Sequence, residues 1–356
     1  MRCNTELNDN ELSTYSRQIR LPEVGREGQE KIKASSVVVV GAGALGCPVL
    51  QYLTAAGVGT IGILDNDWVD ETNLQRQVLY TRKDISKPKP FAAREKLQHL
   101  NPDVTLKMHF IKLDKVTALE IIKEYDIVVD CTDNFATRYL INDACVILRK
   151  PIVYGAIERF SGQIMVLNYK DGPTLRCLYP VQPHPFEARA CEDTGVLGPI
   201  AGIIGSMQAT EVIKIILDLN GILSGKMFFF DSLNLTSQVI TFKRDPARSS
   251  VKELGEYEDI CLGETDEIDD IDLEMYRSMA LTDPDLKIID LRDNPESKDI
   301  GLRTLEIPFR EIIYKMNLIP DSGPKVFYCD YGIKSSIVIS FLKRMYKMDN
   351  LYRLVM

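Results

Sequence analysis

Two motifs in the first part of the chain have residue types that suit a phosphate-rich ligand. The first is the glycine turn GAGALG at residues 41–46, directly after the apolar run at 37–40. Glycines permit close backbone approach, and the helix expected after the turn favours a phosphate at its start. Asp65 stands about twenty residues later, where an acid commonly takes a ribose hydroxyl. The turn alone would also suit NAD, or could merely pack a helix on a sheet.

The second motif, DNDWVDETNLQRQ at residues 65–77, adds groups that can meet a triphosphate. Asn73 and Arg76 are three residues apart, so on a helical turn they share a face. Lys89 precedes Pro90. Because proline suits the first turn of a helix, we expect Lys89 to lie at the start of that helix. Arginine binds phosphate through two hydrogen bonds and lysine as a point charge. The two motifs together predict a polyphosphate clamp.

A third group of polar residues, DCTDN at 130–134, ends another expected strand. A carboxylate beside a nucleotide at the carboxyl end of a strand is a natural Mg²⁺ ligand, which makes Asp133 the candidate. Each of these residues alone could be a solvated charge. Because all of them fall at strand ends on one edge, we interpret them as one site.

The elements that must position these residues alternate between strands and helices, which predicts a mainly parallel α/β sheet. We expect strands at 36–40, 60–64, 105–110, 127–130 and 152–155, and helices at 47–56, 89–101, 116–123 and 137–148. The pattern then changes to antiparallel strands at 162–169 and within 227–243, around a helix at 198–217.

A shift in composition divides the chain. The acidic stretch at 264–272 has little apolar periodicity, so we predict a domain at 1–245, a linker at 246–270 and a smaller α/β domain at 271–356. The smaller domain should contain strands at 287–291 and 325–329 and a helix at 335–346.

Composition excludes several classes of protein. The net charge of −8 argues against nonspecific binding to nucleic acid or anionic membranes. We find no run of 18 apolar residues and no signal-peptide core in the polar segment 1–10, so no membrane span is expected. The eight cysteines are scattered, which suggests free thiols in a reducing cytoplasm.

These motifs, with TYSRQ at 14–18, resemble the ubiquitin-activating superfamily, and within it the MoeB/ThiF branch of sulfur-carrier adenylyltransferases. The resemblance runs from about residue 12 to 244 and implies a Rossmann-like adenylation domain with an antiparallel extension. NAD enzymes lack the NLQRQ element at 73–77 and the spaced Lys89 and Asp133.

The resemblance also implies roles for individual residues. It makes Arg17, Arg76, Lys89 and Asp133 catalytic, with Asp133 on Mg²⁺ and Arg17 reaching into the site of a partner subunit in a homodimer. It assigns ATP binding to Gly41, Gly43, Ala44, Gly46, Asp65, Asp67, Asn73, Arg76, Gln77, Lys89, Asp133 and Asn134.

The implied partner is a ubiquitin-like sulfur carrier of the MoaD or ThiS type that ends in Gly-Gly. Its terminal carboxylate would attack the α-phosphate of ATP and give an acyl-adenylate and pyrophosphate. The pathway would be molybdopterin or thiamine synthesis, and a cysteine desulfurase would be a possible sulfur donor. By resemblance, the presence of a second domain in the same chain favours molybdopterin synthesis.

Two cysteines resemble reactive thiols of known families. Cys191 matches the crossover-loop cysteine of the same family, and it could capture the carrier as a thioester or acyl disulfide. Cys329, between an expected strand and helix, resembles the nucleophile of rhodanese-like sulfurtransferases, with Lys334 where arginine is usual. The chain stops at Met356, before the final turn and helix usual in that family, so the domain would be truncated and could serve for docking alone.

The sequence departs from the family at its structural zinc, which two C-x-x-C pairs usually hold. Here Thr174 replaces the first cysteine of one pair and only Cys177 remains. Arg248 and Val251 lie where the second pair would stand. One thiol cannot build a four-coordinate zinc site, so we expect none.

Two other functions remain open at this point. A non-catalytic scaffold could bind a ubiquitin-like protein, although Arg17, Arg76, Lys89 and Asp133 are all present. An NAD-dependent oxidoreductase would show itself in a titration with NADH, and the sequence offers no evident acid–base pair for it.

Overall fold

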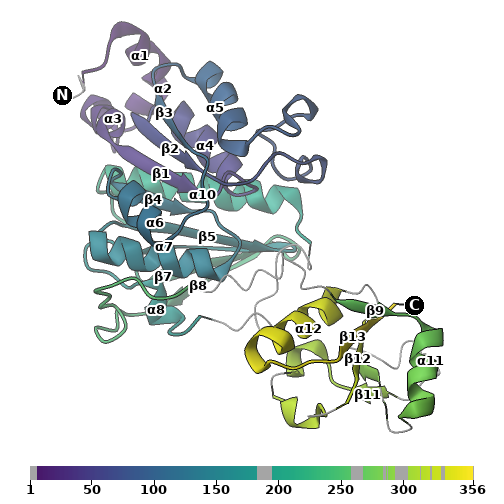
Figure 1. Ribbon diagram of the computed structural model, residues 1–356. Coiled ribbons are helices and arrows are strands. Elements are labelled where there is room, and N and C mark those ends of the chain that lie inside the picture. Colours follow the sequence, from purple (N-terminus) through teal and green to yellow (C-terminus); the bar gives the residue numbers. More distant parts are fainter. Residues whose placement is uncertain are drawn as a thin grey trace. The chain divides into compact units, whose positions relative to one another are not determined.

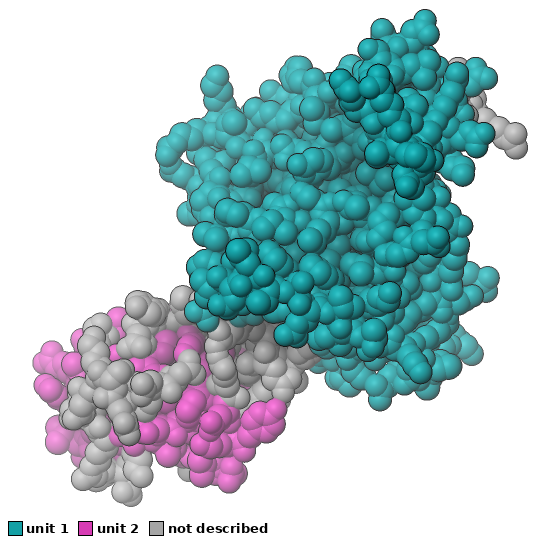
Figure 2. Space-filling model, turned by 180° about the vertical axis from the view of Figure 1, so that it is seen from behind, with its two compact units in different colours: residues 1–183, 189–259 teal, residues 184–188, 260–356 magenta. Residues whose placement is uncertain are grey.

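The structure is a computed structural model that describes residues 6–182, 195–257, 268–283, 286, 288–292, 304–312, 314–320, 323–329 and 333–355. The chain forms two compact units (Figure 2). The described part of the first unit ends at residue 257, and that of the second begins at 268.

The first unit is built on an eight-stranded sheet in the order β3-β2-β1-β4-β5-β6-β7-β8 (Figure 1). The strands from β3 to β5 pair in parallel, and β6 to β8 extend the sheet in antiparallel fashion. This confirms the expected fold class. The strands are β1 Ser36–Val40, β2 Thr60–Leu64, β3 Thr105–His109, β4 Ile127–Asp130, β5 Ile152–Glu158, β6 Ser161–Leu167, β7 Lys226–Asp231 and β8 Thr236–Thr241.

Helices cover both faces of this sheet. They are α4 Gly46–Ala55, α5 Lys89–Leu100, α6 Lys115–Ile122, α7 Phe135–Leu148 and α10 Gly198–Ile216. Val37 and Val39 of β1 pack in one core with residues of α4, α5 and α10, while Val38 and Val40 pack in a second core with residues of α6 and α7. Burial on both faces explains why β1 is a continuous apolar run.

Helix α10 is long and apolar enough to cross a membrane by length and composition, and half of that window is buried inside the structure. It packs closely on α4, because a Cβ added at Gly205 would lie 2.5 Å from Cγ of Pro48. Gly205 therefore allows the two helices to pack closely.

The amino-terminal helices were not expected from the sequence. They are α1 Asp9–Thr14, α2 Ser16–Ile19 and α3 Gly25–Ala34. The first begins with a capping box, in which the side chains of Asn8 and Glu11 bond to each other's backbone N–H. Shorter turns of helix lie at η1 Glu71–Asn73, η2 Arg82–Asp84 and α8 Leu175–Leu178.

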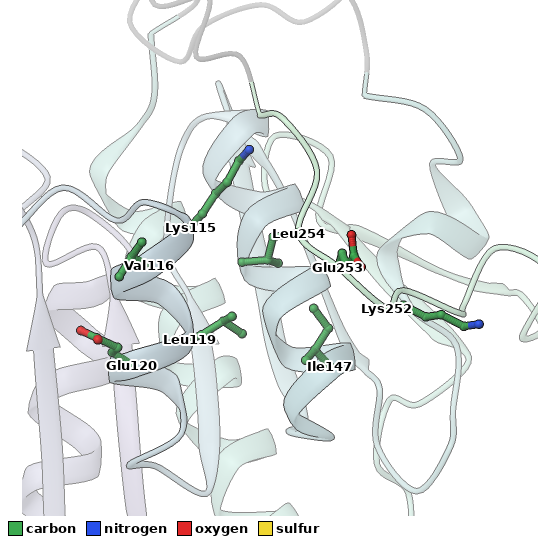
Figure 3. Close-up of a pocket in the computed structure, with 8 residues that line it drawn as sticks. All are labelled: Lys115, Val116, Leu119, Glu120, Ile147, Lys252, Glu253 and Leu254. Atoms are coloured by element: carbon green, nitrogen blue, oxygen red, sulfur yellow. The ribbon is translucent and has the colours of Figure 1, made fainter.

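The part of the expected linker at 246–257 packs on the first unit instead. The Tyr257 hydroxyl donates to Oδ2 of buried Asp143 at 2.7 Å, and Ser249 is buried. Hydrogen bonds hold this segment, and Leu254 and Tyr257 also pack against the core that contains α6 and α7. Beside it lies a hollow of about 520 Å³ between α6, α7 and residues 252–254 (Figure 3). None of the predicted site residues lines this hollow.

The second unit is a five-stranded sheet in the order β11-β10-β12-β13-β9, in which all the described pairs are parallel. Its elements are β9 Asp269–Ile271, α11 Leu273–Thr282, β10 Ile288–Asp290, β11 Thr304–Glu306, η4 Phe309–Glu311, η5 Met316–Leu318, β12 Lys325–Tyr328, α12 Ile333–Tyr346 and β13 Leu351–Leu354. The sequence predicted β10, β12 and α12. It missed the others, which are short or carry mixed polar residues.

Candidate functional site

The glycine turn at 41–46 joins β1 to α4, and two of its glycines are required by the protein itself. Gly41 has φ +94°, and a Cβ there would lie 2.7 Å from the carbonyl oxygen of Cys131. A Cβ at Gly46 would lie 1.9 Å from the carbonyl oxygen of Gly41. These glycines close the turn against the end of β4, and Ala44 lies within it.

Gly43 is different, because no neighbour forces it to be glycine. A Cβ there would lie 3.6 Å from Nε2 of Gln77, an ordinary contact. Gln77 is 4% exposed, and its Oε1 has no hydrogen-bond partner among the described residues. A buried amide oxygen without a partner, next to a glycine that has room for a Cβ, is a place where a polar ligand such as a nucleotide could supply the missing hydrogen bond. The residues present therefore fit the cofactor that the sequence predicts.

Asp65 ties the end of β2 to this turn. Its Oδ2 accepts from the Ala42 N–H at 2.7 Å and its Oδ1 from the Asp67 N–H at 2.8 Å. Burial raises the pKa of Asp65, while nearby Lys89 and these two hydrogen bonds oppose the shift. Each carboxylate oxygen keeps a further lone pair, which leaves room for a hydroxyl donor such as a ribose.

Tyr80 also holds the turn, and the sequence analysis missed it. Its hydroxyl is buried and donates to the carbonyl oxygen of Ala42 at 2.8 Å. A single tyrosine in a loop of mixed composition gives no periodic signal, so only the folded chain reveals this contact.

Lys89 is the first residue of α5, as expected, and its side chain is only 6% exposed. Its Nζ lies 2.8 Å from Oδ2 of Asp67, and its N–H donates to the Asp67 carbonyl at 2.9 Å. The segments around Trp68 and Pro88 pair as an isolated bridge. Asp67 is thus the direct partner of Lys89, a contact that the sequence did not predict.

Arg76 and Asn73 share one turn, because the Arg76 N–H donates to the Asn73 carbonyl at 3.0 Å. Nη1 of Arg76 donates to the Thr72 carbonyl at 3.0 Å. The start of α10 lies against this turn, since a Cβ at Gly198 would be 2.5 Å from the Gln75 carbonyl oxygen. A helix start therefore adjoins the turn that carries the arginine.

Asp133 and Asn134 follow β4. Asn134 caps α7 by accepting from the Thr137 N–H at 2.8 Å. The Asp133 side chain is exposed, and no hydrogen bond or ion pair joins it to the described part of the chain. The described residues contain no group of three or more potential metal ligands. A Mg²⁺ held by one carboxylate would take its other ligands from water and substrate phosphates, as is usual for this ion.

The strand order brings these groups to one edge of the sheet. Val40 of β1 is in register with Leu64 of β2 on one side and Asp130 of β4 on the other. The residues that follow these strands therefore meet where the strand order reverses, which is the usual ligand site of open α/β sheets.

Arg17 does not join this group within its own chain. It is exposed on α2, and the next residue, Gln18, bonds to the Ala56 carbonyl at the far end of α4 from the glycine turn. A helix of the length of α4 spans about 15 Å, which is longer than an arginine side chain.

Of the two predicted reactive thiols, Cys191 lies outside the described residues. Cys329 follows β12 and is buried at the start of α12. The Ser335 N–H donates to its Sγ at 3.4 Å, and the Ser335 hydroxyl lies 3.5 Å away. A sulfur at a helix start with N–H donors suits a thiolate or a sulfur-bearing anion. Nζ of Lys334 lies 5.9 Å from the centre of the Phe309 ring.

Polar groups surround Cys177, the cysteine that remains from the zinc site considered in the sequence analysis. Its Sγ lies 3.0 Å from the Ser249 hydroxyl and accepts from the N–H groups of Asp245 at 3.3 Å and Thr174 at 3.4 Å. Burial alone would raise the pKa of Cys177, but these hydrogen bonds lower it. The sulfur is thus held by hydroxyl and amide groups.

We therefore predict that the purified protein contains no stoichiometric zinc, because a lone thiol among such groups cannot replace four ligands. Elemental analysis after dialysis measures this directly, and incubation with a chelator should leave the melting temperature unchanged. About one tightly bound zinc per chain would contradict the prediction.

Known proteins resemble this chain in sequence and in fold. The ThiF family matches residues 15–251. The adenylyltransferase and sulfurtransferase MOCS3 of Aedes aegypti is 38% identical, with 98% of this chain and 85% of that protein aligned. The sulfur carrier protein adenylyltransferase of Thermus thermophilus is 45% identical over 70% of this chain and 97% of its own length. The solved structure of E. coli MccB with ATP has a TM-score of 0.58 at 23% identity, covers 70% of this chain and 75% of its own, and supports the fold.

Proposed function

Because the chain belongs to the ThiF family, we propose that it is an enzyme that uses ATP to adenylate the carboxyl terminus of a ubiquitin-like sulfur carrier, and then supplies sulfur to make a thiocarboxylate. The observation that carries the proposal is the meeting of the glycine turn, Asp65 and Lys89 at the point where the strand order reverses. Molybdopterin and thiamine synthesis are the pathways that the relatives support.

The chemistry requires two anions to approach each other, so positive charge and alignment dominate catalysis. The start of α4 and the glycine turn at Gly43 would hold the phosphates, and Asp65 would hold the ribose. Lys89 and Arg76 would neutralise charge as the carrier carboxylate forms a bond to the α-phosphorus and pyrophosphate leaves. Asp133 would hold Mg²⁺, which neutralises further phosphate charge.

The second unit would carry the sulfur. The Cys329 thiolate would attack the outer sulfur of a donor such as thiosulfate, forming an S–S bond and releasing sulfite. The bound sulfur would then attack the adenylated carboxyl carbon and displace AMP. Displacement of AMP would leave the carrier on Cys329 as an acyl disulfide. The Cys191 thiol or an external thiol would attack the sulfur of Cys329 and release the thiocarboxylate, and a thiol reductant would return the resulting disulfide to thiols. A cysteine desulfurase would be a suitable sulfur donor in the cell.

Two further features belong to the proposal. The five described cysteines are free thiols, which supports a reducing compartment, the cytoplasm. A homodimer would bring Arg17 of one copy to the nucleotide site of the other, since α4 separates Arg17 from the site of its own chain.

ATP–pyrophosphate exchange tests the function. We expect exchange that depends on a MoaD-type or ThiS-type carrier and is lost when the terminal glycine of that carrier is deleted. A protein that binds such a carrier but never exchanges would be the scaffold considered above. Tight binding of NADH without exchange would favour the oxidoreductase instead.

The dimer makes a separate prediction. Arg17→Ala and Asp133→Ala proteins should each be nearly inactive, and mixing them should restore about a quarter of wild-type exchange, since random exchange makes half of the dimers mixed and each has one complete site. Subunit exchange is verified with two affinity tags. No recovery in verified mixed dimers would mean that Arg17 serves its own chain.

A further inference from the structure

Arg17 is flanked by two residues that fix its backbone firmly. Tyr15 is 4% exposed, and its hydroxyl accepts from Nδ2 of Asn101 at 2.8 Å. Gln18 donates from Nε2 to Oε1 of Gln29 at 2.5 Å and to the Ala56 carbonyl at 3.3 Å. Arg17 itself is exposed. The arginine is therefore free to meet a ligand, although its neighbours on both sides are held.

The partners of these two residues are themselves well held. Gln29 is fully buried and donates from Nε2 to the Ala56 carbonyl at 2.9 Å. Asn101 is 4% exposed and also donates to the Thr54 carbonyl at 2.9 Å. Tyr15 and Gln18, called the anchor, thus bond to groups on α3 and at the carboxyl-terminal ends of α4 and α5, and burial there keeps water from weakening side-chain hydrogen bonds.

Gly57 shows how closely the Tyr15 ring is seated. A Cβ at Gly57 would lie 2.5 Å from Cζ and the hydroxyl oxygen of Tyr15, so only glycine leaves room for the ring. Gly57 follows α4, and Asn101 follows α5. These are the two helices whose other ends carry the glycine turn and Lys89.

Helix α2 needs this support, because it has four residues and no side-chain cap. A single turn of helix is unstable by itself in water. Without Tyr15 and Gln18, the backbone at Arg17 would lose its direction, and an arginine must be aligned to within about an ångström to stabilise a reacting phosphate.

We propose that Tyr15 and Gln18 are positioning residues that hold Arg17 for the nucleotide site of a second copy of the chain. The inference rests on the proposed function. It adds that Tyr15 and Gln18 act on the nucleotide site of the partner subunit rather than on the nucleotide site of their own chain. The ligand that Arg17 would meet there is a polyphosphate.

The test uses a Tyr15→Phe/Gln18→Ala double variant of the full chain, called the anchor variant. Ser36→Ala is the matched control, because it removes a hydrogen bond between Ser36 and Asp126 at the amino-terminal end of β1. We expect the anchor variant to form dimers and to keep its KM for ATP, with kcat for pyrophosphate exchange lowered about tenfold to a hundredfold. The control should stay near wild type.

Mixing the anchor variant with Asp133→Ala protein then locates the defect. We expect exchange to recover toward a quarter of the wild-type rate. The Asp133→Ala chain supplies an Arg17 held by intact Tyr15 and Gln18, and the anchor-variant chain supplies an intact nucleotide site. Absence of recovery in verified mixed dimers would place the damage in the variant's own site and overturn the proposal. Wild-type kcat in the anchor variant, with Arg17→Ala inactive, would also overturn it. If Arg17→Ala were fully active, the role of Arg17 in the proposed function would be contradicted instead.

If the anchor variant does not form dimers, the single Tyr15→Phe variant replaces it, because it loses one hydroxyl and keeps the ring against Gly57. The same two measurements apply to it. An unchanged kcat in this variant, together with an unchanged kcat in Gln18→Ala, would overturn the proposal.

Discussion

Replacing Arg76 or Lys89 by alanine is expected to slow carrier-dependent ATP–pyrophosphate exchange by about a hundredfold or more, because each removes positive charge from a crowded group of phosphates. Lys89 should show the larger loss, since its ammonium is nearly buried beside Asp67. A buried charge interacts more strongly than an exposed one. The effect should fall on kcat, because the charge that develops on pyrophosphate is greatest in the transition state.

Lys83→Ala is the matched control, because Lys83 is exposed in the same connection between β2 and α5. Circular dichroism and thermal melting establish that each variant folds, which matters because Lys89→Ala leaves the Asp67 carboxylate without its partner. Lys89→Arg keeps the charge and should retain part of the activity. Folded Arg76→Ala and Lys89→Ala proteins with full exchange would rule out the polyphosphate clamp.

Replacing Cys329 by serine should abolish thiosulfate sulfurtransferase activity and slow thiocarboxylate formation, while pyrophosphate exchange stays unchanged. Adenylation needs no thiol, because a carboxylate attacks phosphorus, whereas sulfur transfer needs a nucleophile that can carry a second sulfur atom. A serine hydroxyl cannot do this. The separation should be clear because Cys329 lies in its own unit of the chain.

Cys177→Ser serves as the control for this experiment, since its sulfur already lies among hydroxyl and amide groups and it should keep both activities. Cys191→Ser should spare exchange and impair the later transfer. Equal loss of exchange and sulfur transfer in Cys329→Ser would contradict the division of labour. A wild-type protein without sulfurtransferase activity would assign the second unit a docking role and require an external donor.

The sequence predicted the parts of the fold that depend on strong local patterns. The apolar runs of β1 and β2 were placed to the residue, because burial on both faces permits few polar interruptions. The glycine turn and Asp65 were found from spacing alone, and the structure joins them through the hydrogen bond to Ala42.

Other features depend on contacts between distant residues and left no local signal. Segment 246–257 is held through contacts of Ser249 with Cys177 and of Tyr257 with Asp143, which lie far away in sequence, so its polar composition was interpreted as a linker. The pairing of Lys89 with Asp67 follows from a bridge between two loops that the sequence does not specify locally. The helices α1 and α2 are too short for periodicity to show, and tertiary contacts stabilise them.

The glycine turn is bonded from three sides before any nucleotide arrives. Asp65 accepts from the Ala42 N–H, Tyr80 donates to the Ala42 carbonyl, and the Gly41 N–H donates to the Leu64 carbonyl at 2.8 Å. A turn held in this way has little conformational entropy left to lose on binding, so the affinity for a nucleotide is not reduced by the cost of ordering a loop. The nucleotide then binds to a preformed site. Its association rate should be limited by diffusion and charge rather than by a conformational change of the turn.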